Sequence, residues 1–527
     1  MLRYQDFVRR MKSIPTWQWA AIFLFVGLAG LYAALSPGSM QGMGYTGEEI
    51  GSADRILTRL DAWRKSVPAP PMAWSRHGPL PVLLDMPFVV FGKLAISPDF
   101  IMSFEPILLT AALLVLLFVW LRSVTSPGMS LLLTFAAAFG TMLWPYAYIG
   151  LEPKQSFFIL LAGYLALACG PIRGWPRVVG FAVVCGLVVA LKSTGIVLFP
   201  VIGWLLYVQF QKDWRIRRAE VLTMVLIIGA FWAGSAWGRM PYWSAREGGM
   251  KVILTVFIDS PLAYFVNWIG IFGAPNKGLF IYAPILLLAV FAFPRALRTH
   301  RRLAIFVLLL VGCVAAELAM LRAPADEVWG SRYLHCVVAP LLLVLGAAYP
   351  RFEWRIGAPI AALTTVGVVI SFLGAFFYYG HVHFATIQAG QNNLEWLAGD
   401  TVWNPVRFHG RLFRTWLRGS STPVLWSPGH FWMYDPPPGM PPEKAIDLRD
   451  FAKPQAKLLR LWNAPKAGQN LWVFVFYLGA FAIGAASSIL AAMMTIKPWP
   501  EPREHGPGDD GQSKPEIEIL AGSQGNG

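Results

Sequence analysis

The sequence predicts an all-α polytopic membrane protein with about twelve transmembrane helices joined by large outer loops. Of its 527 residues, 56% are hydrophobic and only 14% are charged, and the mean hydropathy is +0.51, which is too apolar for an ordinary soluble protein. Apolar runs of about 20 residues, the length that crosses a bilayer, recur along the chain. The net charge of +15 comes from short basic clusters between these runs, so we expect no nucleic-acid partner.

The first apolar run covers 17–35 and follows four basic residues. A cleavable signal peptide is the alternative, but the length of the run and the many later runs favour an uncleaved first helix. The eleven further runs lie at 104–121, 128–148, 155–170, 178–191, 195–211, 220–238, 279–293, 303–321, 333–349, 357–378 and 471–496. The pair at 178–191 and 195–211 is short, and a re-entrant pair would leave the topology of the others unchanged.

Basic residues agree with this topology. If the N-terminus is cytoplasmic, every second connection is cytoplasmic and should carry Lys or Arg. Each of these connections does, at Arg122, at Arg173 and Arg177, at Lys212, Arg215, Arg217 and Arg218, at Arg295, Arg298, Arg301 and Arg302, and at Arg351 and Arg355. The chain is therefore predicted to be multi-pass, with the remaining connections on the outer side.

Three outer connections are too long to be turns. We therefore divide the chain into a transmembrane module, 1–378, with outer loops at 37–103 and 239–278; an outer loop domain, 379–470; a last transmembrane helix, 471–496; and a disordered cytoplasmic tail, 497–527. Within the first loop, 82–95 is apolar but too short to span, which indicates a helix lying on the membrane surface.

The first outer loop contains an unusual acidic segment, Gly44–Asp61, which begins a few residues after the first run. Its Glu48 and Glu49 lie close enough to the bilayer for one carboxylate to face a membrane-level cavity and act as a general base toward a hydroxyl. The alternative is that these acids form the solvated first turn of a short helix, where they favour the helix dipole.

Basic residues on the outer side break the positive-inside rule and need another reason to be there. They are Lys154, Lys192, Arg239, Arg246, Lys251, Lys277, Arg322 and Arg332. Carboxylates and cations on one face would suit a phosphate-bearing substrate.

Glu152 precedes Pro153, so it either lies at the positive end of the next helix or acts as a second acid beside the first loop, orienting the base or holding a metal or an amino group. Lys192 interrupts an apolar region, which indicates either a functional cation or a side chain that snorkels to the interface.

Two further cations stand next to predicted spans. Lys277, followed by Gly278, is either a phosphate contact or part of an interfacial turn. Arg332, beside Tyr333, is either a phosphate clamp or an interfacial residue paired with Asp326 or Glu327.

The histidines form no recognisable ligand set, since the pair His381 and His383 alone is weak evidence for a metal. We therefore predict no metal and no other cofactor.

Several of these motifs occur together in one order: the acidic pair, Gly78-Pro79-Leu80-Pro81, Glu152-Pro153, Lys277-Gly278-Leu279-Phe280 with Tyr282 and Pro284, and Trp329-Gly330-Ser331-Arg332-Tyr333-Leu334. This order resembles the C-type (polytopic membrane) glycosyltransferase superfamily, specifically the bacterial relatives of protein mannosyltransferases and of the lipid A aminoarabinose transferase. The similarity covers about residues 15–380.

The resemblance implies a membrane glycosyltransferase in the bacterial inner membrane, with a polyprenyl-phosphate sugar as donor and an active site that faces the periplasm. The first-loop catalytic carboxylate of the family, usually Asp, falls on Glu48 or Glu49, and we favour Glu48. Arg332 and Lys277 fall where the family handles the lipid phosphate. The resemblance leaves open whether the acceptor is a protein, a lipid or a glycan.

Other functions fit the same pattern. A transporter or flippase for a lipid-linked saccharide should carry charged or helix-breaking residues near the middle of several spans, whereas the polar exceptions here lie at outer ends. An assembly protein that binds through 379–470 and a ligase that moves a whole polymer are further alternatives.

Overall fold

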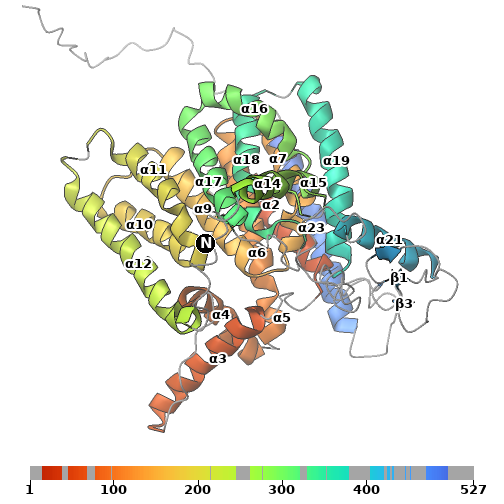
Figure 1. Ribbon diagram of the computed structural model, residues 1–527, viewed down its shortest axis with the longest axis horizontal. Coiled ribbons are helices and arrows are strands. Elements are labelled where there is room, and N and C mark those ends of the chain that lie inside the picture. The colour runs from red at the N-terminus through yellow and green to blue at the C-terminus, as the bar shows by residue number, and fades with distance from the viewer. Residues whose placement is uncertain are drawn as a thin grey trace, which may run out of the picture.

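The structure is a computed structural model, and almost all of its described part is helical (Figure 1). The described residues are 15–37, 45–67, 78–95, 98–213, 215–244, 261–275, 277–320, 329–351, 353–378, 404–419, 424–427, 430–432, 445–446, 452 and 471–496.

The elements follow the chain in this order. The first half contains α2 (Thr16–Leu35), α3 (Tyr45–Arg64), α4 (Pro79–Ala95), α5 (Pro98–Met102), α6 (Phe104–Arg122), α7 (Pro127–Phe139), α8 (Leu143–Tyr146), α9 (Leu151–Leu167), α10 (Trp175–Ala190), η1 (Ser193–Leu198), α11 (Phe199–Phe210) and α12 (Arg218–Ser244). The second half contains α14 (Pro261–Gly273), α15 (Leu279–Tyr282), α16 (Leu286–Thr299), α17 (Arg301–Met320), η2 (Arg332–Leu334), α18 (His335–Ala348), α19 (Trp354–Phe376), α21 (Pro405–Arg418), β1 (Val424–Ser427), β2 (His430–Trp432), β3 (Ala445–Ile446) and α23 (Leu471–Ile496).

Each of the twelve predicted spans contains a helix, and the chain is a multi-pass membrane protein. Among the described residues, six helical stretches are long and apolar enough to cross a bilayer: Thr16–Leu35, Phe100–Arg122, Arg218–Gly238, Arg301–Ala319, Trp354–Phe376 and Val473–Thr495. Shorter apolar helices include Pro127–Phe139, Trp175–Ala190, Gly195–Phe210 and Arg332–Ala348. The total of about twelve crossings stays a prediction.

Two predicted spans are interrupted. The run 128–148 divides into α7 and α8, because the helix ends at Gly140. The run 279–293 begins as α15 and resumes as α16 after Pro284, which has no N–H to donate to a continuing helix. Since α16 continues to Thr299, Arg295 and Arg298 lie within that helix rather than in the predicted connection.

The prediction of an acidic loop at Gly44–Asp61 was wrong in one respect, because most of it is helix α3. No proline interrupts Tyr45–Arg64, and Ala53, Ile56 and Leu57 recur at helical spacing. These residues pack against α4, the helix that contains the apolar segment 82–95 predicted to lie on the membrane surface.

The other two long connections also contain structure. Within 239–278, α12 continues to Ser244 and α14 adds a further helix. Within 379–470, helix α21 is followed by a small antiparallel sheet with strand order β2-β1-β3, in which Leu425 faces Trp432 and Val424 faces Ile446. The all-α prediction therefore holds for the transmembrane module but not for this outer segment.

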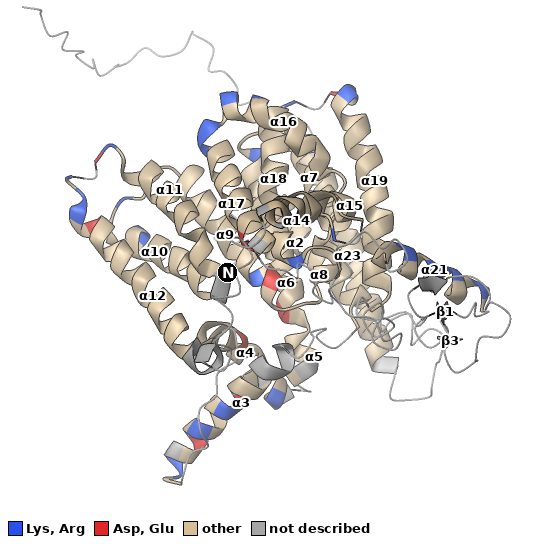
Figure 2. Cartoon of the chain, viewed as in Figure 1, with Lys and Arg blue, Asp and Glu red and all other residues tan. Residues whose placement is uncertain are grey.

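Charged residues lie mainly at the ends of the spanning helices and on α3 and α21, two helices of the predicted outer connections (Figure 2). Figure 2 shows Lys and Arg gathered at the same side of α12, α16 and α19, at the top of the view, while most of the spanning helices are free of colour. A small group of charged residues interrupts this pattern near α6 and α9. Because charge inside a membrane protein is costly, this group is the first candidate for a functional site.

Two apolar clusters hold the described helices. The main core extends over α2, α6, α7, α9, α10 and α16 to α18. A separate small core contains Ala53 of α3, Val82 and Val89 of α4, and Met102 of α5, with Ile56, Leu57 and Phe88 packed on it. Helices α3 to α5 thus form a unit with its own apolar core, which we call the first-loop unit.

The first and last helices, α2 and α23, pack closely against each other. Gly30 of α2 approaches Gly484 of α23 so nearly that a Cβ on Gly484 would lie 2.6 Å from the backbone N of Leu31. Small residues permit this contact, as in other membrane helix pairs. The C-terminal helix therefore returns to the N-terminal one and closes the bundle.

We expect Gly484→Leu to destabilise the protein by about 1–3 kcal/mol or more, because the new side chain must push two backbones apart. Gly479→Leu on the same helix is the matched control, since a Cβ there meets nothing within 4 Å. Thermal unfolding in detergent micelles measures both. Equal melting temperatures for the two variants would contradict the close contact.

Candidate active site

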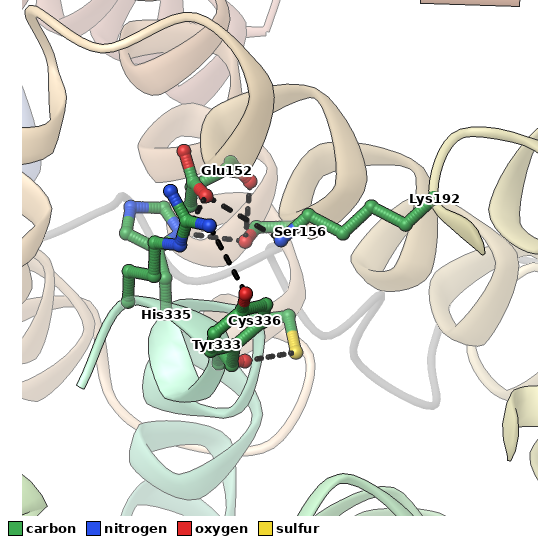
Figure 3. A network of polar contacts seen from close by, with 7 residues as sticks. Glu152, Ser156, Lys192, Tyr333, His335 and Cys336 are labelled. Carbon is green, nitrogen blue, oxygen red and sulfur yellow. Dashed lines mark hydrogen bonds and ion pairs between the residues drawn. The ribbon is translucent and has the colours of Figure 1, made fainter. Parts of the chain in front are cut away.

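The centre of the site is Glu152, in the first turn of α9 (Figure 3). Its carboxylate is buried, and Oε1 lies 3.5 Å from Nζ of Lys192 and 3.7 Å from Nε of Arg332. No side chain caps α9, and Pro153 is its third residue rather than its first. Glu152 therefore serves as the partner of two cations in addition to occupying the helix start.

The two cations come from distant segments. Lys192 sits in extended conformation between α10 and η1, and Arg332 opens η2. Both are buried, and Lys192 points to Glu152 rather than to solvent, as snorkelling would require; its functional role stays a prediction. With one carboxylate and two cations, the cluster carries a net positive charge.

Tyr333 joins these cations from one side. Its ring centroid lies 5.1 Å from Nζ of Lys192 and 4.8 Å from Cζ of Arg332. An Nη of Arg332 also donates to the Tyr333 hydroxyl at 3.0 Å. The guanidinium is therefore oriented from two directions, by a carboxylate at Nε and by a phenol at Nη.

The turn before Arg332 is fixed by Gly330 and Trp329. Gly330 has φ of +65°, and a Cβ there would lie 2.8 Å from the Tyr282 ring, so glycine is required on both counts. Trp329 is fully buried, with Tyr282 at its edge and His409 of α21 stacked on it at a centroid distance of 4.8 Å. Helix α21 thus buttresses the turn that presents Arg332.

Lys277 lies in the turn between α14 and α15 and is buried. The same turn receives the start of α21, because Nδ2 of Asn404 donates to the Pro275 carbonyl at 2.7 Å. Helix α21 therefore contacts the segment of Lys277 as well as the segment of Arg332, and it ties these two predicted phosphate contacts to one support.

Ser156 and His335 were not predicted as site residues. Ser156 Oγ lies 2.9 Å from the Glu152 carbonyl oxygen and 2.6 Å from Nδ1 of His335. Since the hydroxyl has one proton, donation to the carbonyl leaves its oxygen to accept from Nδ1–H. This pair joins α9 to the start of α18, and so connects the backbone of Glu152 to the segment that carries Arg332.

A small cavity adjoins the cluster. It is lined by Gln155, Glu317, Tyr333 and Cys336 with three apolar residues, and it has a volume of about 10 Å³, room for one water. Glu317, in α17, was also missed from the sequence. The polar lining continues the site from Tyr333 toward α17.

A second ionic cluster lies two residues along α9. Nζ of Lys154 pairs with Oδ1 of Asp85 in α4 and lies 3.4 Å from Oε1 of Glu105 in α6. All three side chains are buried. Here two carboxylates share one cation, the reverse of the balance around Glu152.

Some predicted site residues are not placed. Glu48 and Glu49 lie in the first turn of α3, but their side chains are outside the described residues. Asp326 and Glu327, the predicted partners of Arg332, lie outside the described residues; among the described residues, Glu152 is an ionic partner of Arg332. His381 and His383 also lie outside the described part.

Within the described part of the chain, no three His, Cys, Asp or Glu residues gather closely enough to hold a metal ion. The chemistry available at Glu152, Lys192 and Arg332 is instead that of a buried cation pair steadied by a carboxylate. Such a pair can accept an anionic oxygen group, and phosphate matches the guanidinium in charge and in geometry.

No family model and no curated protein matches the sequence. Among solved structures, the crystal structure of ArnT from Cupriavidus metallidurans in the apo state aligns with the chain at a TM-score of 0.42 and 13% identity, over 91% of this chain and 77% of that chain. ArnT is the lipid A aminoarabinose transferase, one of the proteins that the sequence motifs resemble. Because this TM-score is low, the function proposed below rests on the residues of the site.

Proposed function

We propose that the protein is a membrane glycosyltransferase of the C-type, which moves a sugar from a polyprenyl-phosphate donor to an acceptor hydroxyl. The observation that supports this most is the buried cluster of Lys192 and Arg332 around Glu152, all within 4 Å. Two buried cations at the ends of apolar helices suit the phosphate of a membrane lipid. The order of motifs along the sequence agrees with this reading.

The cations stabilise the leaving group. As the bond between the anomeric carbon and the phosphate oxygen breaks, negative charge grows on the lipid phosphate. Arg332 and Lys192 supply two positive charges, and Lys277 is a further candidate contact. Glu152 and Tyr333 keep the two cations in place, so little reorganisation is needed when the charge develops.

A carboxylate of α3 supplies the base. Glu48 is our choice and Glu49 the alternative, as the resemblance implies. The carboxylate takes the proton from the acceptor hydroxyl, the hydroxyl oxygen bonds to the anomeric carbon through an oxocarbenium-like state, and the bonding electron pair leaves with the phosphate. One displacement from the opposite face inverts the configuration.

The reaction is assigned to the periplasmic side of the bacterial inner membrane. The site residues come from the helix ends that the basic connections place on the outer side. The donor reaches the site from the membrane, and the acceptor is a protein, a lipid or a glycan. The scheme uses the cations of the chain itself and involves no metal or cofactor.

A transporter or flippase for a lipid-linked saccharide is less well supported. Its polar groups should lie near the middle of several spans. Here Glu152 lies in the first turn of α9, Arg332 in the turn before α18, and Lys192 in the break after α10. The charges therefore collect at helix ends, as a site that meets a headgroup requires.

The function is tested by removing the proposed base. We expect Glu48→Gln, or Glu49→Gln if the neighbour is the base, to reduce transfer from a labelled lipid-linked sugar by about 10²–10⁴-fold. Asp61→Asn is the control, because that acid lies in the same helix and is exposed beside Lys65. If both Gln variants are well expressed and keep full transfer, the mechanism is wrong.

A further inference from the structure

The ionic cluster of Asp85, Glu105 and Lys154 has no part in the proposed reaction, yet it is the most deeply buried charge in the described structure. The side chains of Asp85 and Lys154 are fully buried and that of Glu105 is 3% exposed. Removing charges from water costs several kcal/mol per ion. This cluster joins α4 and α6, which are close in sequence, to the more distant α9.

Asp85 is the member that belongs to the first-loop unit. Helix α4 holds α3 through the small core around Ala53, Val82 and Val89. A surface ion pair between Lys93 of α4 and Asp54 of α3 adds to this contact. Because α3 rests on α4 in this way, a shift of α4 must also shift α3, the helix that contains Glu48 and Glu49.

The first-loop unit is weakly joined to the rest of the molecule by apolar packing. Its core is separate from the main core, and its described links to other helices include the passage from α5 into α6, the approach of Pro79 to Gly238 of α12, and the ring contact of Phe100 with Phe476 of α23. In Figure 1, α3 extends away from the bundle. The bridge from Asp85 to Lys154 is the buried polar tie between this unit and α9.

Lys154 connects this tie to the active site, because it follows Glu152 by two residues in the first turns of α9. One end of α9 therefore holds Glu152 among its cations and also holds the helix on which α3 rests. The distance between α3 and the site around Glu152 therefore depends on the pairing of Asp85 with Lys154 and on the position of Lys154 beside Glu152 in α9.

We propose that Asp85, acting through Lys154, is a positioning residue that fixes the first-loop unit against α9 and so sets the distance from α3 to Glu152, Lys192 and Arg332. The proposal rests on the proposed function only in the role it gives to Glu48 and Glu49. The tie itself is a statement about structure and can be tested alone.

The chain offers a matched control. Asp85→Leu and Glu105→Leu each remove one carboxylate from the same ammonium, and each leaves a neutral pair around Lys154. Asp85→Leu removes the carboxylate that α4 contributes, whereas Glu105→Leu removes one from the first turn of α6 and leaves the bridge from α4 to Lys154 in place. Asp85→Asn keeps an oxygen that can accept from Lys154, so it should fall between the native protein and Asp85→Leu.

The first measurement is the distance between spin labels at Leu60 of α3 and Leu308 of α17. Both positions are exposed, and the labels are introduced as cysteines in a chain lacking its four native cysteines. We expect double electron–electron resonance to show a clearly broadened distance distribution in Asp85→Leu and a native distribution in Glu105→Leu. A native distribution in Asp85→Leu, or equal broadening in both variants, would overturn the proposal.

The second measurement is transfer from a labelled lipid-linked sugar. For a positioning residue, we expect Asp85→Leu to lower kcat by at least tenfold while KM for the donor changes less than threefold, because Lys192 and Arg332 are untouched. A change confined to KM would overturn the role in positioning α3. If the native protein transfers no sugar, the proposed function fails, and the distance measurement still decides whether the tie exists.

Discussion

Arg332→Lys is expected to reduce transfer by about 10²–10³-fold, the usual effect of removing one preorganised donor from a developing anion. Nε of Arg332 faces Glu152 at 3.7 Å while an Nη donates to Tyr333 at 3.0 Å. A lysine ammonium is a single point charge and cannot meet both partners and a phosphate at once. Initial rates with a labelled lipid-linked sugar measure the loss.

Two variants make this result specific. Arg355→Lys changes an exposed arginine at the start of α19, on the opposite side of the protein, and should leave the rate unchanged. Tyr333→Phe removes only the hydroxyl that accepts from Arg332 and should cause a smaller loss than Arg332→Lys. A native rate in Arg332→Lys would show that the guanidinium does not contact the leaving phosphate.

The helices of the membrane module could be predicted from sequence because their signal is local. A run of about 20 apolar residues is sufficient evidence for a helix in a bilayer, where every backbone group must be hydrogen-bonded within its own segment. The breaks were missed because a single Gly140 or Pro284 changes the hydropathy of a run very little. The acidic segment was predicted as a loop, with a short helix as the alternative; the helix signal is weak because the apolar residues that pack against α4 and α5 are few.

The members of the site were predictable one at a time, but their pairing was not. Lys192 and Arg332 stand out as charges in apolar surroundings on the outer side, and Glu152 as an acid at a helix start. Lys192 and Glu152 are separated by 40 residues along the chain, and sequence patterns carry no information on which distant helix ends meet. The structure adds Glu152 as a partner of Arg332, while the predicted partners Asp326 and Glu327 lie outside the described residues.

Asp85, Glu105 and Glu317 could have been found by the reasoning that selected Lys192. Each is a single acid in an otherwise apolar helix, and ionisable residues in such places are costly unless paired. The positive-inside rule concerns only basic residues, so it does not single out these acids. His335 gave no such signal, because a neutral imidazole is tolerated in a core and its role depends on Ser156, which is 179 residues away.

Glu152→Gln and Glu105→Gln make the same chemical change at two buried clusters and should have opposite consequences for stability. At Glu152 one carboxylate balances Lys192 and Arg332, so its loss leaves two buried cations facing each other. Removing one partner of a buried ion pair costs about 3–5 kcal/mol. We therefore expect a large fall in the melting temperature of Glu152→Gln.

At Glu105 the balance is reversed. Two carboxylates share Lys154, so Glu105→Gln leaves the neutral pair of Asp85 and Lys154 and removes the repulsion between two acids. We expect its melting temperature in detergent micelles to equal or exceed that of the native protein. If Glu105→Gln lowers the melting temperature as much as Glu152→Gln does, the balance of positive and negative charges does not determine the stability of these clusters. A large loss in Glu152→Gln and none in Glu105→Gln would show that Glu152 holds two cations together in a low-dielectric site. A phosphate-binding centre needs such a carboxylate while its anionic ligand is absent.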